Sequence, residues 1–381
     1  MRFDGILVGG GLQSCLIARA VLARDPGAKL AVIERGEKLG GEHTWCFHSG
    51  DLDGGMEDVV KPLVVRRWPA YDVRFPEGAR RIDRGYAMLH SERLAEVMTA
   101  ELEHAPGTKL LLGAAATQVA SDAVTLEDGE VLNAPWVIDS RGPESLRLNG
   151  GAFQKFVGLE LSLASPWRSE LPLIMDATVP QTDGFRFMYS LPLSPSRVLL
   201  EDTYYSESAV LDVPELTRRI LAYAEATGVK VVSVVRTERG VLPIPLGPLT
   251  PPDVSPLQGG YAGGWFHATT GYSLPAAARL ARLVAESWPS APTAQALSRL
   301  RRELSCQNKF FRVLNRLLFR AYEGPKRWQA LARFYRMPEA TIERFYAMRT
   351  TRWDQARILL GRPPRGVSLT RAFAELTHAT K

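Results

Sequence analysis

Short apolar runs and one helical pattern alternate over the first 34 residues of the chain. Residues 3–8 (FDGILV) read as a buried strand, and a glycine-rich turn (GGGLQS) follows at residues 9–14. The next ten residues carry apolar side chains at helical spacing until Asp-Pro-Gly interrupts them at residues 25–27. Residues 29–33 predict a second strand, which ends at Glu34. The pattern therefore predicts a βαβ unit.

This βαβ unit has the features of a dinucleotide-binding fingerprint. Gly9 and Gly11 allow a tight turn and let backbone N–H groups approach a pyrophosphate at the helix N-terminus. Ser14 stands where the fingerprint has its third glycine, and it is small enough to preserve the packing of helix on strand. Glu34 would accept hydrogen bonds from the ribose hydroxyls. A glycine turn that binds no nucleotide is the alternative.

The surroundings of this turn favour a flavin over a nicotinamide dinucleotide. Arg35 follows Glu34, Gly41 stands shortly after, and no second glycine fingerprint follows a strand. We therefore expect FAD as the cofactor, with Arg35 and Gly41 at its site.

Two later segments extend the predicted cofactor site. Residues 136–143 read as a strand that enters a glycine turn, which brings in Asp139 and Gly142. Residues 263–275 read as a strand that leads to a helix starting near Pro275. The N-terminus of that helix favours an anionic or electron-rich ring system. The cofactor contacts expected there are Thr270, Gly271, Tyr272 and Ser273.

Between about residues 150 and 235 the pattern changes to short alternating strands. Residues 185–191 and 197–205 predict a hairpin around a Ser-Pro-Ser turn, in an antiparallel sheet of the kind that walls a substrate cavity. Its aromatic side chains fit a large apolar ligand, although packing in the sheet core is the more ordinary role for any one of them. The substrate-binding residues expected here and further along are Phe185, Phe187, Tyr205 and Trp265.

Glu201 and Asp202 are adjacent in the second strand of this hairpin, so they point to opposite faces of the sheet. One carboxyl group can face a cavity while the other does not. The pattern alone leaves open which one does, and it also allows both to be solvated.

From residue 293 onward the chain is predicted to be nearly all helix. One helix carries an apolar stripe beside a basic stripe, an arrangement that suits a helix lying in a membrane interface or an ordinary core-facing helix with a solvated basic face. The apolar stripe is Phe310, Phe311, Leu314, Leu317, Leu318 and Ala321, and the basic stripe is Arg312, Arg316 and Arg320.

The charge of the chain is divided unevenly. Residues 301–381 hold 18 Lys and Arg against 6 Asp and Glu, whereas the first 300 residues hold 29 against 35. The formal net charge of +6 therefore combines an acidic body with a strongly basic tail. A basic surface attracts phosphate, either of nucleic acid or of anionic lipid.

Composition narrows the class of protein. A chain of 381 residues with 45% hydrophobic and 23% charged residues is typical of a globular protein with two or three structural units. Three cysteines without a CxxC pair, and six scattered histidines, argue against a disulfide framework and a metal site, so we expect no metal. Neither a signal peptide nor an apolar stretch of about 18 residues is present, which predicts a cytoplasmic protein, soluble or peripheral on a membrane.

Taken together, these segments resemble the bacterial lycopene β-cyclase family of flavoproteins. The resemblance covers nearly the whole chain, and its most specific stretches are LEDTYYSE, FHATTGYSLP and the C-terminal block from LNRLLFRA to RFY. It implies acid-catalysed, redox-neutral cyclisation of the ψ-ends of lycopene to β-ionone rings, giving γ-carotene and then β-carotene. It also implies reduced FAD as cofactor and NAD(P)H as external reductant. The essential acid of the family, in its (F/L)(L/I)E(D/E)T motif, falls on Glu201.

The resemblance implies an α/β fold: a Rossmann-type FAD-binding domain like that of aromatic hydroxylases and geranylgeranyl reductases, an antiparallel-sheet substrate domain and a helical C-terminal region. We expect FAD binding by residues 1–60, 85–150 and 235–290, substrate binding by 61–84 and 151–234, and a basic, membrane-facing region at 291–381. Lycopene is dissolved in the bilayer, so the implied partner is anionic lipid at the inner face of the cell membrane.

Three histidines lie near the predicted flavin site on this resemblance: His43, His48 and His267. Structural hydrogen bonding is the favoured role for each, ahead of catalysis. Two other functions remain open. One is an FAD-dependent hydroxylase or prenyl reductase acting on an isoprenoid or aromatic substrate. The other is a nucleic-acid-binding protein, which is disfavoured because the basic charge lies on amphipathic helices and no nucleic-acid motif is present.

Overall fold

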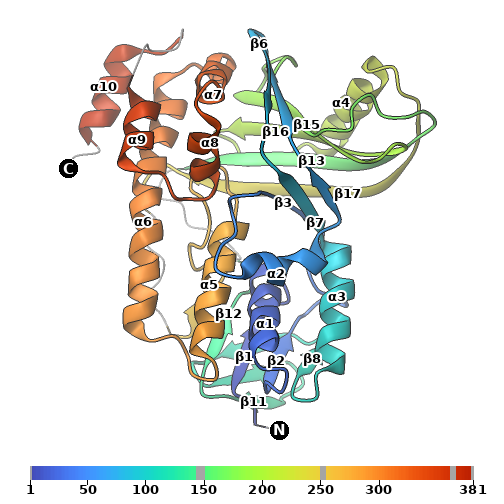
Figure 1. The fold of residues 1–381 in the computed structure, drawn as a ribbon, viewed down its shortest axis with the longest axis vertical. Coiled ribbons are helices and arrows are strands. Elements are labelled where there is room, and N and C mark those ends of the chain that lie inside the picture. Colours follow the sequence, from blue (N-terminus) through green and yellow to red (C-terminus); the bar gives the residue numbers. More distant parts are fainter. Residues whose placement is uncertain (1, 143–150, 249–254, 361–365, 379–381) are drawn as a thin grey trace.

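The computed structural model describes residues 2–142, 151–248, 255–360 and 366–378 (Figure 1). The N-terminal part contains a five-stranded parallel sheet in the order β18-β12-β1-β2-β8. The central strand β1 is wholly buried, which explains its unbroken apolar sequence. The sheet strands are β1 (Gly5–Val8), β2 (Leu30–Ile33), β8 (Lys109–Leu111), β12 (Val137–Asp139) and β18 (Leu257–Gln258).

Three helices lie against one another beside this sheet in Figure 1: α1 (Leu12–Arg24), α3 (Ser91–His104) and α5 (Leu274–Ser287). Helix α1 packs closely on α5, and the Gln13 side chain donates a hydrogen bond of 3.1 Å to the Ala277 carbonyl. The N-terminal ends of the two helices are therefore close together. A short helix α2 (Met56–Val60) and a 3₁₀ turn (Lys61–Leu63) connect this part to the next strands.

A seven-stranded sheet forms the upper part of the molecule in Figure 1, in the order β17-β13-β16-β15-β14-β5-β6. Its pairs are antiparallel except that of β14 with β5. Helix α4 (Val213–Ala226) covers one face, and the opposite face joins the main hydrophobic core. The strands are β5 (Tyr71–Phe75), β6 (Gly78–Ile82), β13 (Gly151–Leu163), β14 (Leu173–Asp176), β15 (Phe185–Ser194), β16 (Arg197–Ser206) and β17 (Val231–Pro245).

Two three-stranded sheets complete the strand content of the described residues. One has the order β3-β7-β4 and is antiparallel, with β3 (Thr44–His48), β4 (Arg66–Trp68) and β7 (Tyr86–His90). The other has the order β11-β10-β9, with β9 (Ala116–Val119), β10 (Ala123–Leu126) and β11 (Val131–Asn133).

The C-terminal part is helical, as predicted. Helix α6 (Ala294–Arg316) runs along one side of the molecule and continues as a π-helical turn, Leu317–Ala321 (Figure 1). The apolar stripe predicted there belongs largely to the core, since Phe310, Phe311 and Leu318 are buried. A 3₁₀ turn (Gly324–Lys326) and four shorter helices follow: α7 (Trp328–Phe334), α8 (Glu339–Tyr346), α9 (Arg352–Leu359) and α10 (Leu369–His378).

Two secondary-structure predictions are wrong. Residues 263–273 form turns instead of a strand, because backbone N–H groups bond within the segment, as from Gly264 to the Tyr261 carbonyl. The strand of this region is β18, six residues earlier. Helix α4 lies inside the stretch predicted to hold only strands. Its signals are an Asp212 N-cap, whose side chain accepts the Glu215 N–H, and apolar residues at helical spacing.

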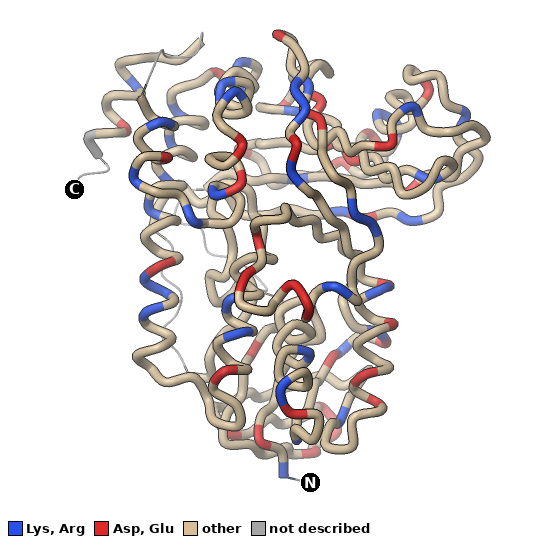
Figure 2. Tube along the Cα trace, viewed as in Figure 1, with Lys and Arg blue, Asp and Glu red and all other residues tan. Residues whose placement is uncertain are grey.

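Two of the three arginines in the predicted basic stripe form ion pairs within the molecule. Glu375 of α10 pairs with both Arg316 (3.3 Å) and Arg320 (3.1 Å), and Arg316 also donates to the Leu246 carbonyl. Figure 2 shows Lys and Arg positions close to Asp and Glu positions on the C-terminal helices. Part of the basic charge of the tail is therefore engaged in ion pairs within the molecule.

The division into three units stays a prediction. Strands β5 and β6, from residues 61–84, do join the sheet formed by residues 151–234. Strand β17 crosses the expected boundary between residues 234 and 235. Residue 143, which ends the strand and glycine turn predicted at residues 136–143, lies outside the described residues.

Candidate functional site

The glycine turn after β1 has the geometry expected at a dinucleotide pyrophosphate. Gly9 has φ +93°, and a Cβ there would lie 2.9 Å from the Ser140 carbonyl, so only glycine fits. Gly11 is the N-cap residue of α1 and no side chain caps this helix end. A Cβ on Gly11 would meet no atom within 4 Å. Among the described residues, no side chain therefore pairs with the first N–H groups of α1, and open space lies beside Gly11.

Glu34 lies beside this turn, at the end of β2. Its carboxylate accepts hydrogen bonds from the N–H groups of Gly10 (2.6 Å) and Gly36 (2.8 Å). Arg35 is exposed next to it, and Gly41 is exposed with φ +64°. The structure thus gathers the predicted residues of the first 41 positions around one turn.

Polar atoms without partners converge near the same turn. The Ser14 and Ser140 hydroxyls and the Gln13 side-chain carbonyl are buried and have no hydrogen-bond partner among the described residues. A Cβ on Gly142 would meet no atom within 4 Å, and Asp139 is held by Arg141 through a 2.7 Å ion pair. Buried polar groups without partners are uncommon in native proteins. These groups and the open glycines fit a bound dinucleotide.

The second helix N-terminus belongs to α5, where the predicted residues Thr270–Ser273 lie. Ser273 is the N-cap residue of α5. Within the described residues, its side chain makes no capping hydrogen bond with the backbone N–H groups of the first turn. Gly271 adopts φ +66°. The Tyr272 hydroxyl donates to the Asp51 carboxylate at 3.0 Å, and burial raises the pKa of Asp51 to about 7. The close packing of α1 on α5 brings both uncapped helix ends to one region.

Glu201 and Asp202 occupy the two faces of β16. Asp202 lies under α4, where Arg186 donates to its carboxylate at 2.7 and 3.0 Å and Tyr204 donates at 3.0 Å. Glu201 points to the face that joins the main core, and the Thr203 hydroxyl donates to it. Of these two neighbours, only Glu201 therefore directs its carboxyl group toward the main core.

The environment of Glu201 keeps its proton bound. Burial is the largest cause that raises the pKa of Glu201 to about 8, and the negative charge of Glu238 adds to it. Tyr189 of β15 lies directly opposite Glu201 in register. Its hydroxyl donates to the Cys46 thiol (3.0 Å) and hydrogen-bonds the Tyr86 hydroxyl (2.8 Å). A neutral carboxylic acid beside aromatic and weakly polar groups can donate a proton.

Three of the four predicted substrate residues lie together on the same face as Glu201. Phe185 and Phe187 stack with ring centroids 5.2 Å apart, and Tyr205 lies 5.9 Å from Phe185. Trp265 takes a different position. Its indole N–H donates to the Gln258 carbonyl at 2.8 Å, and the Arg301 guanidinium lies over its ring. The structure therefore does not group Trp265 with the aromatic cluster.

The three histidines differ in their surroundings. His43 is exposed next to Gly41, whereas His48 is buried among Tyr71, Tyr86 and Tyr346. His267 is buried against Phe311 and bonds the Phe345 carbonyl. Burial lowers the pKa of His48 and of His267 to about 3, so both are neutral in the structure.

Tyr189 is among the hairpin aromatic side chains that fit a large apolar ligand, and period-2 alternation places it on the same face as Phe185 and Phe187. Sequence reasoning missed Tyr86, Cys46, Asp51 and Glu238, which come from distant strands and turns and gave no local signal. In the described residues, no group of three or more His, Cys, Asp or Glu is placed to hold a metal ion.

Comparison with known sequences identifies the protein family. The family model described as lycopene cyclase protein matches residues 4–372. The chain is 42% identical to the lycopene beta-cyclase of Pantoea ananas over 369 residues, 95% of each protein. It is 39% identical to the lycopene beta-cyclase of a Paracoccus species over 377 residues, covering 96% of this chain and 95% of the relative.

Comparison with solved structures identifies the fold. A geranylgeranyl bacteriochlorophyll reductase-like protein of Thermoplasma acidophilum superposes with a TM-score of 0.61 at 13% identity, covering 99% of this chain and 96% of the other. A probable FAD-dependent monooxygenase of Pseudomonas aeruginosa gives 0.57 at 17% identity, covering 84% and 96%. The predicted fold, shared with flavin-dependent hydroxylases and reductases, is confirmed.

Proposed function

The chain belongs to the lycopene cyclase family, and we propose that it closes the ψ-ends of lycopene into β-ionone rings with Glu201 as the acid. The observation that carries this assignment is the single inward carboxyl group of β16 beside an aromatic cluster. The neighbouring Asp202 is engaged by Arg186 on the other face of the sheet.

The reaction begins with a proton. Glu201 in its neutral form donates a proton to the terminal double bond of the substrate, which leaves a tertiary carbocation. A neighbouring double bond supplies its electron pair to that cation and closes a six-membered ring. The ring then loses one proton, to the Glu201 carboxylate or to water, which restores a neutral product, so no electrons are gained or lost overall.

The aromatic cluster has two roles in this proposal. Phe185, Phe187 and Tyr205 offer an apolar wall to a hydrocarbon, and their ring faces stabilise a nearby cation when water is excluded. Thr203 orients the Glu201 carboxyl group.

FAD is the cofactor that the turn after β1 fits, with the uncapped ends of α1 and α5 and the unpartnered Ser14 hydroxyl as its partners. The nucleotide part would lie along Gly9 and Gly11. Bound in its reduced, anionic form, with NAD(P)H as the external reductant, FAD would supply negative charge that stabilises the carbocation. A redox-neutral reaction then has a reason to require reductant.

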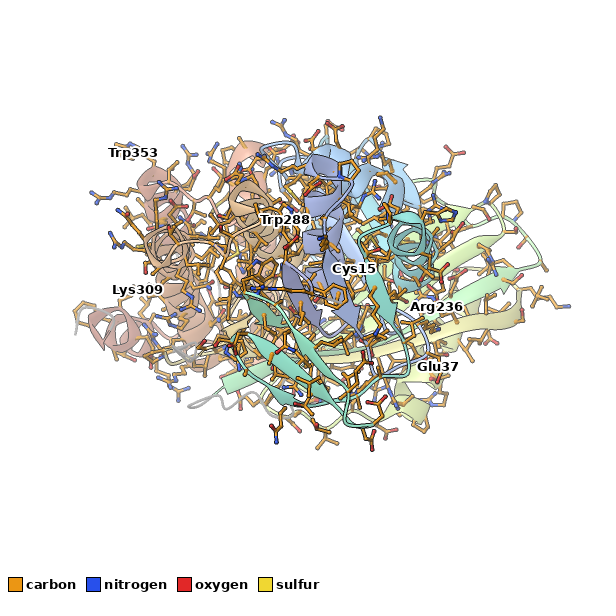
Figure 3. The ribbon with its side chains drawn as sticks, turned by 90° about the horizontal axis from the view of Figure 1, so that it is seen from below. Cys15, Glu37, Arg236, Trp288, Lys309 and Trp353 are labelled. Atoms are coloured by element: carbon orange, nitrogen blue, oxygen red, sulfur yellow. The ribbon has the colours of Figure 1, made fainter. Side chains whose placement is uncertain are left out.

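Access to a hydrocarbon substrate calls for contact with a bilayer. Among the described residues, no helix is both long and apolar enough to cross one. Helices α9 and α10 and their flanks instead expose large apolar side chains, with Trp353 83% and Phe373 70% exposed. Figure 3 shows Trp353 at the outer edge of the molecule, on the side away from Arg236. Exposed apolar side chains beside Arg352 and Arg371 suit peripheral attachment to anionic lipid.

The test is pigment analysis of the purified chain with lycopene in anionic liposomes, with FAD and NAD(P)H. We expect β-ionone rings in the product and NAD(P)H consumption far below one per ring. Consumption of one NAD(P)H per product would instead indicate a hydroxylase or reductase. Absence of cyclised product with FAD bound and reduced would contradict the proposal.

A further inference from the structure

Glu201 has a second carboxylate as a neighbour across the sheet, and a glycine separates the two. Gly158 of β13 lies in register with Glu201 of β16 on one side and with Glu238 of β17 on the other. Directly paired residues point to the same face of a sheet. Two strand spacings put the α-carbons of the two glutamates roughly 10 Å apart. A side chain at the middle position would stand between them.

The Glu238 side chain occupies the space above that glycine. A Cβ on Gly158 would lie 2.8 Å from Glu238 Cγ and 3.0 Å from its Oε1. The carboxylate thus leans across β13 in the direction of Glu201. Glu238 is only 3% exposed, so water screens its charge weakly.

Two side chains hold the Glu238 carboxyl group in place. The Arg236 guanidinium donates to its Oε2 at 2.8 Å, and the Thr44 hydroxyl donates to the same oxygen at 2.7 Å. Arg236 also donates to Thr44, which closes a triangle of hydrogen bonds. His43 also interacts electrostatically with Glu238, but burial lowers the pKa of His43 and so disfavours its charged form.

Arg236 is shared with two more acids, Glu160 at 3.4 Å and Glu92 at 3.8 Å. The arginine is therefore surrounded by three carboxylates and cannot fully neutralise Glu238. The other groups facing Glu201 are Thr203, Tyr189 and the Cys46 thiol, and Asp202 acts from the opposite face. In the row of paired residues Glu238, Gly158, Glu201 and Tyr189, Glu238 carries the one carboxyl group besides that of Glu201.

We propose that Glu238 is a positioning residue of this reaction, whose carboxylate, laid over Gly158, keeps the acid proton on Glu201. This inference rests on the proposed function, since it assigns a role to the acid of that reaction. A fixed negative charge near Glu201 opposes ionisation of its carboxyl group. The absence of a side chain at Gly158 is what lets this charge act across the strand.

The test measures the titration of Glu201 by infrared spectroscopy, without turnover, on the full chain with FAD bound. The protonated-carboxyl band that disappears in Glu201→Gln is followed against pH. In Glu238→Gln we expect its midpoint to fall by about one pH unit, because one charge is removed while the Thr44 and Arg236 hydrogen bonds can persist. Glu238→Asp keeps the charge and should stay close to the parent.

The matched control is Glu160→Gln. Glu160 lies two residues along β13 from Gly158 and forms an ion pair with the same arginine, Arg236, so this substitution removes an equal negative charge. Its midpoint should shift by less than a third of the Glu238→Gln shift. Equal shifts in both variants, or none in Glu238→Gln, would overturn the proposal.

Gly158→Ala provides an independent reading if Glu238→Gln does not fold. The added methyl group displaces Glu238 and leaves every charge in the chain, so the midpoint should move down as well. If the Glu201 titration midpoint is unchanged in a folded Gly158→Ala variant, the roles proposed for Gly158 and for the Glu238 carboxylate are wrong. Because these readouts need no product, they stay decisive even if lycopene is not cyclised.

Discussion

Glu201 and Asp202 are consecutive residues whose carboxyl groups lie on opposite faces of β16 and have different surroundings. Asp202 forms a bidentate ion pair with Arg186 beneath α4. Glu201 faces the interior, where burial and a neighbouring carboxylate raise its pKa to about 8. One strand thus carries, at adjacent positions, a carboxylate held in an ion pair and a carboxyl group with a raised pKa.

Substituting Glu201 should separate catalysis from folding. We expect Glu201→Gln to lower the rate of ring closure by at least about 100-fold, since amide nitrogen cannot donate a proton to an alkene. FAD content and thermal unfolding should match the parent. Measurement of carotenoid products together with flavin absorbance checks this. A Gln variant that cyclises lycopene normally would show that another group is the acid.

Asp202→Asn should have the complementary effect. Removing one charge of a buried ion pair leaves Arg186 uncompensated, which costs about 3 kcal/mol of folding free energy. We expect a lower denaturation midpoint in urea, with ring closure retained in the folded fraction. Unchanged stability together with lost activity would reverse the roles assigned to the two acids.

The pH dependence of the reaction follows from the raised pKa of Glu201. The neutral carboxyl group is the active form, and it predominates below the pKa of about 8. Activity should therefore be retained at neutral pH and fall as pH rises through about 8. Initial rates in liposomes across this range, with bound FAD monitored in parallel, provide the measurement. A rate that increases through pH 8 would indicate a base in place of an acid.

Gly11→Val should block FAD binding without disturbing the fold. The position has open space around its Cβ and an ordinary backbone conformation, so valine meets no clash in the chain alone. Its side chain would occupy the path expected for the pyrophosphate. Gly27→Ala, in the exposed turn after the same helix, is the control. Flavin absorbance after purification should be lost only in Gly11→Val; retention there would place the nucleotide elsewhere.

Membrane binding should depend on the exposed apolar residues of α9 and α10. We expect Trp353→Ser and Phe373→Ser to weaken flotation with anionic liposomes, because each removes a large exposed apolar side chain. Val210→Ser, at a position that is 75% exposed in the loop before α4, is the control. High salt should weaken binding further. If all three variants bind liposomes equally, this surface is not the membrane-binding surface.

Asp354 is predicted to anchor the C-terminal helices. Arg344 donates to it twice, Thr341 and Thr351 add hydroxyl donors, and these hydrogen bonds hold the pKa of Asp354 well below its usual range. The stabilisation is present above the unfolded-state pKa of about 3.9 and is lost as pH falls below it. Since Arg344 is partly exposed, we expect Asp354→Asn to cost about 2 kcal/mol at neutral pH. Equal urea midpoints at pH 7 would contradict this.

The sequence by itself determined the dinucleotide turn, the hairpin and the helical tail. Each depends on residues within about 35 positions of one another, so periodicity, glycine spacing and chain breaks carry the information. The same local pattern misplaced the strand near residue 263 and passed over α4. In the first case, backbone hydrogen bonds inside a glycine-rich segment outweighed its apolar run.

Only the tertiary structure decided the surroundings of the acid. Period-2 geometry placed Glu201 and Asp202 on opposite faces, but the position of α4 determines which face is structural. The row Glu238–Gly158–Glu201 joins residues more than 35 positions apart through strand register. Register is set by the packing of whole strands, and electrostatic effects on a buried carboxyl group depend on distance in space, which no local sequence pattern records.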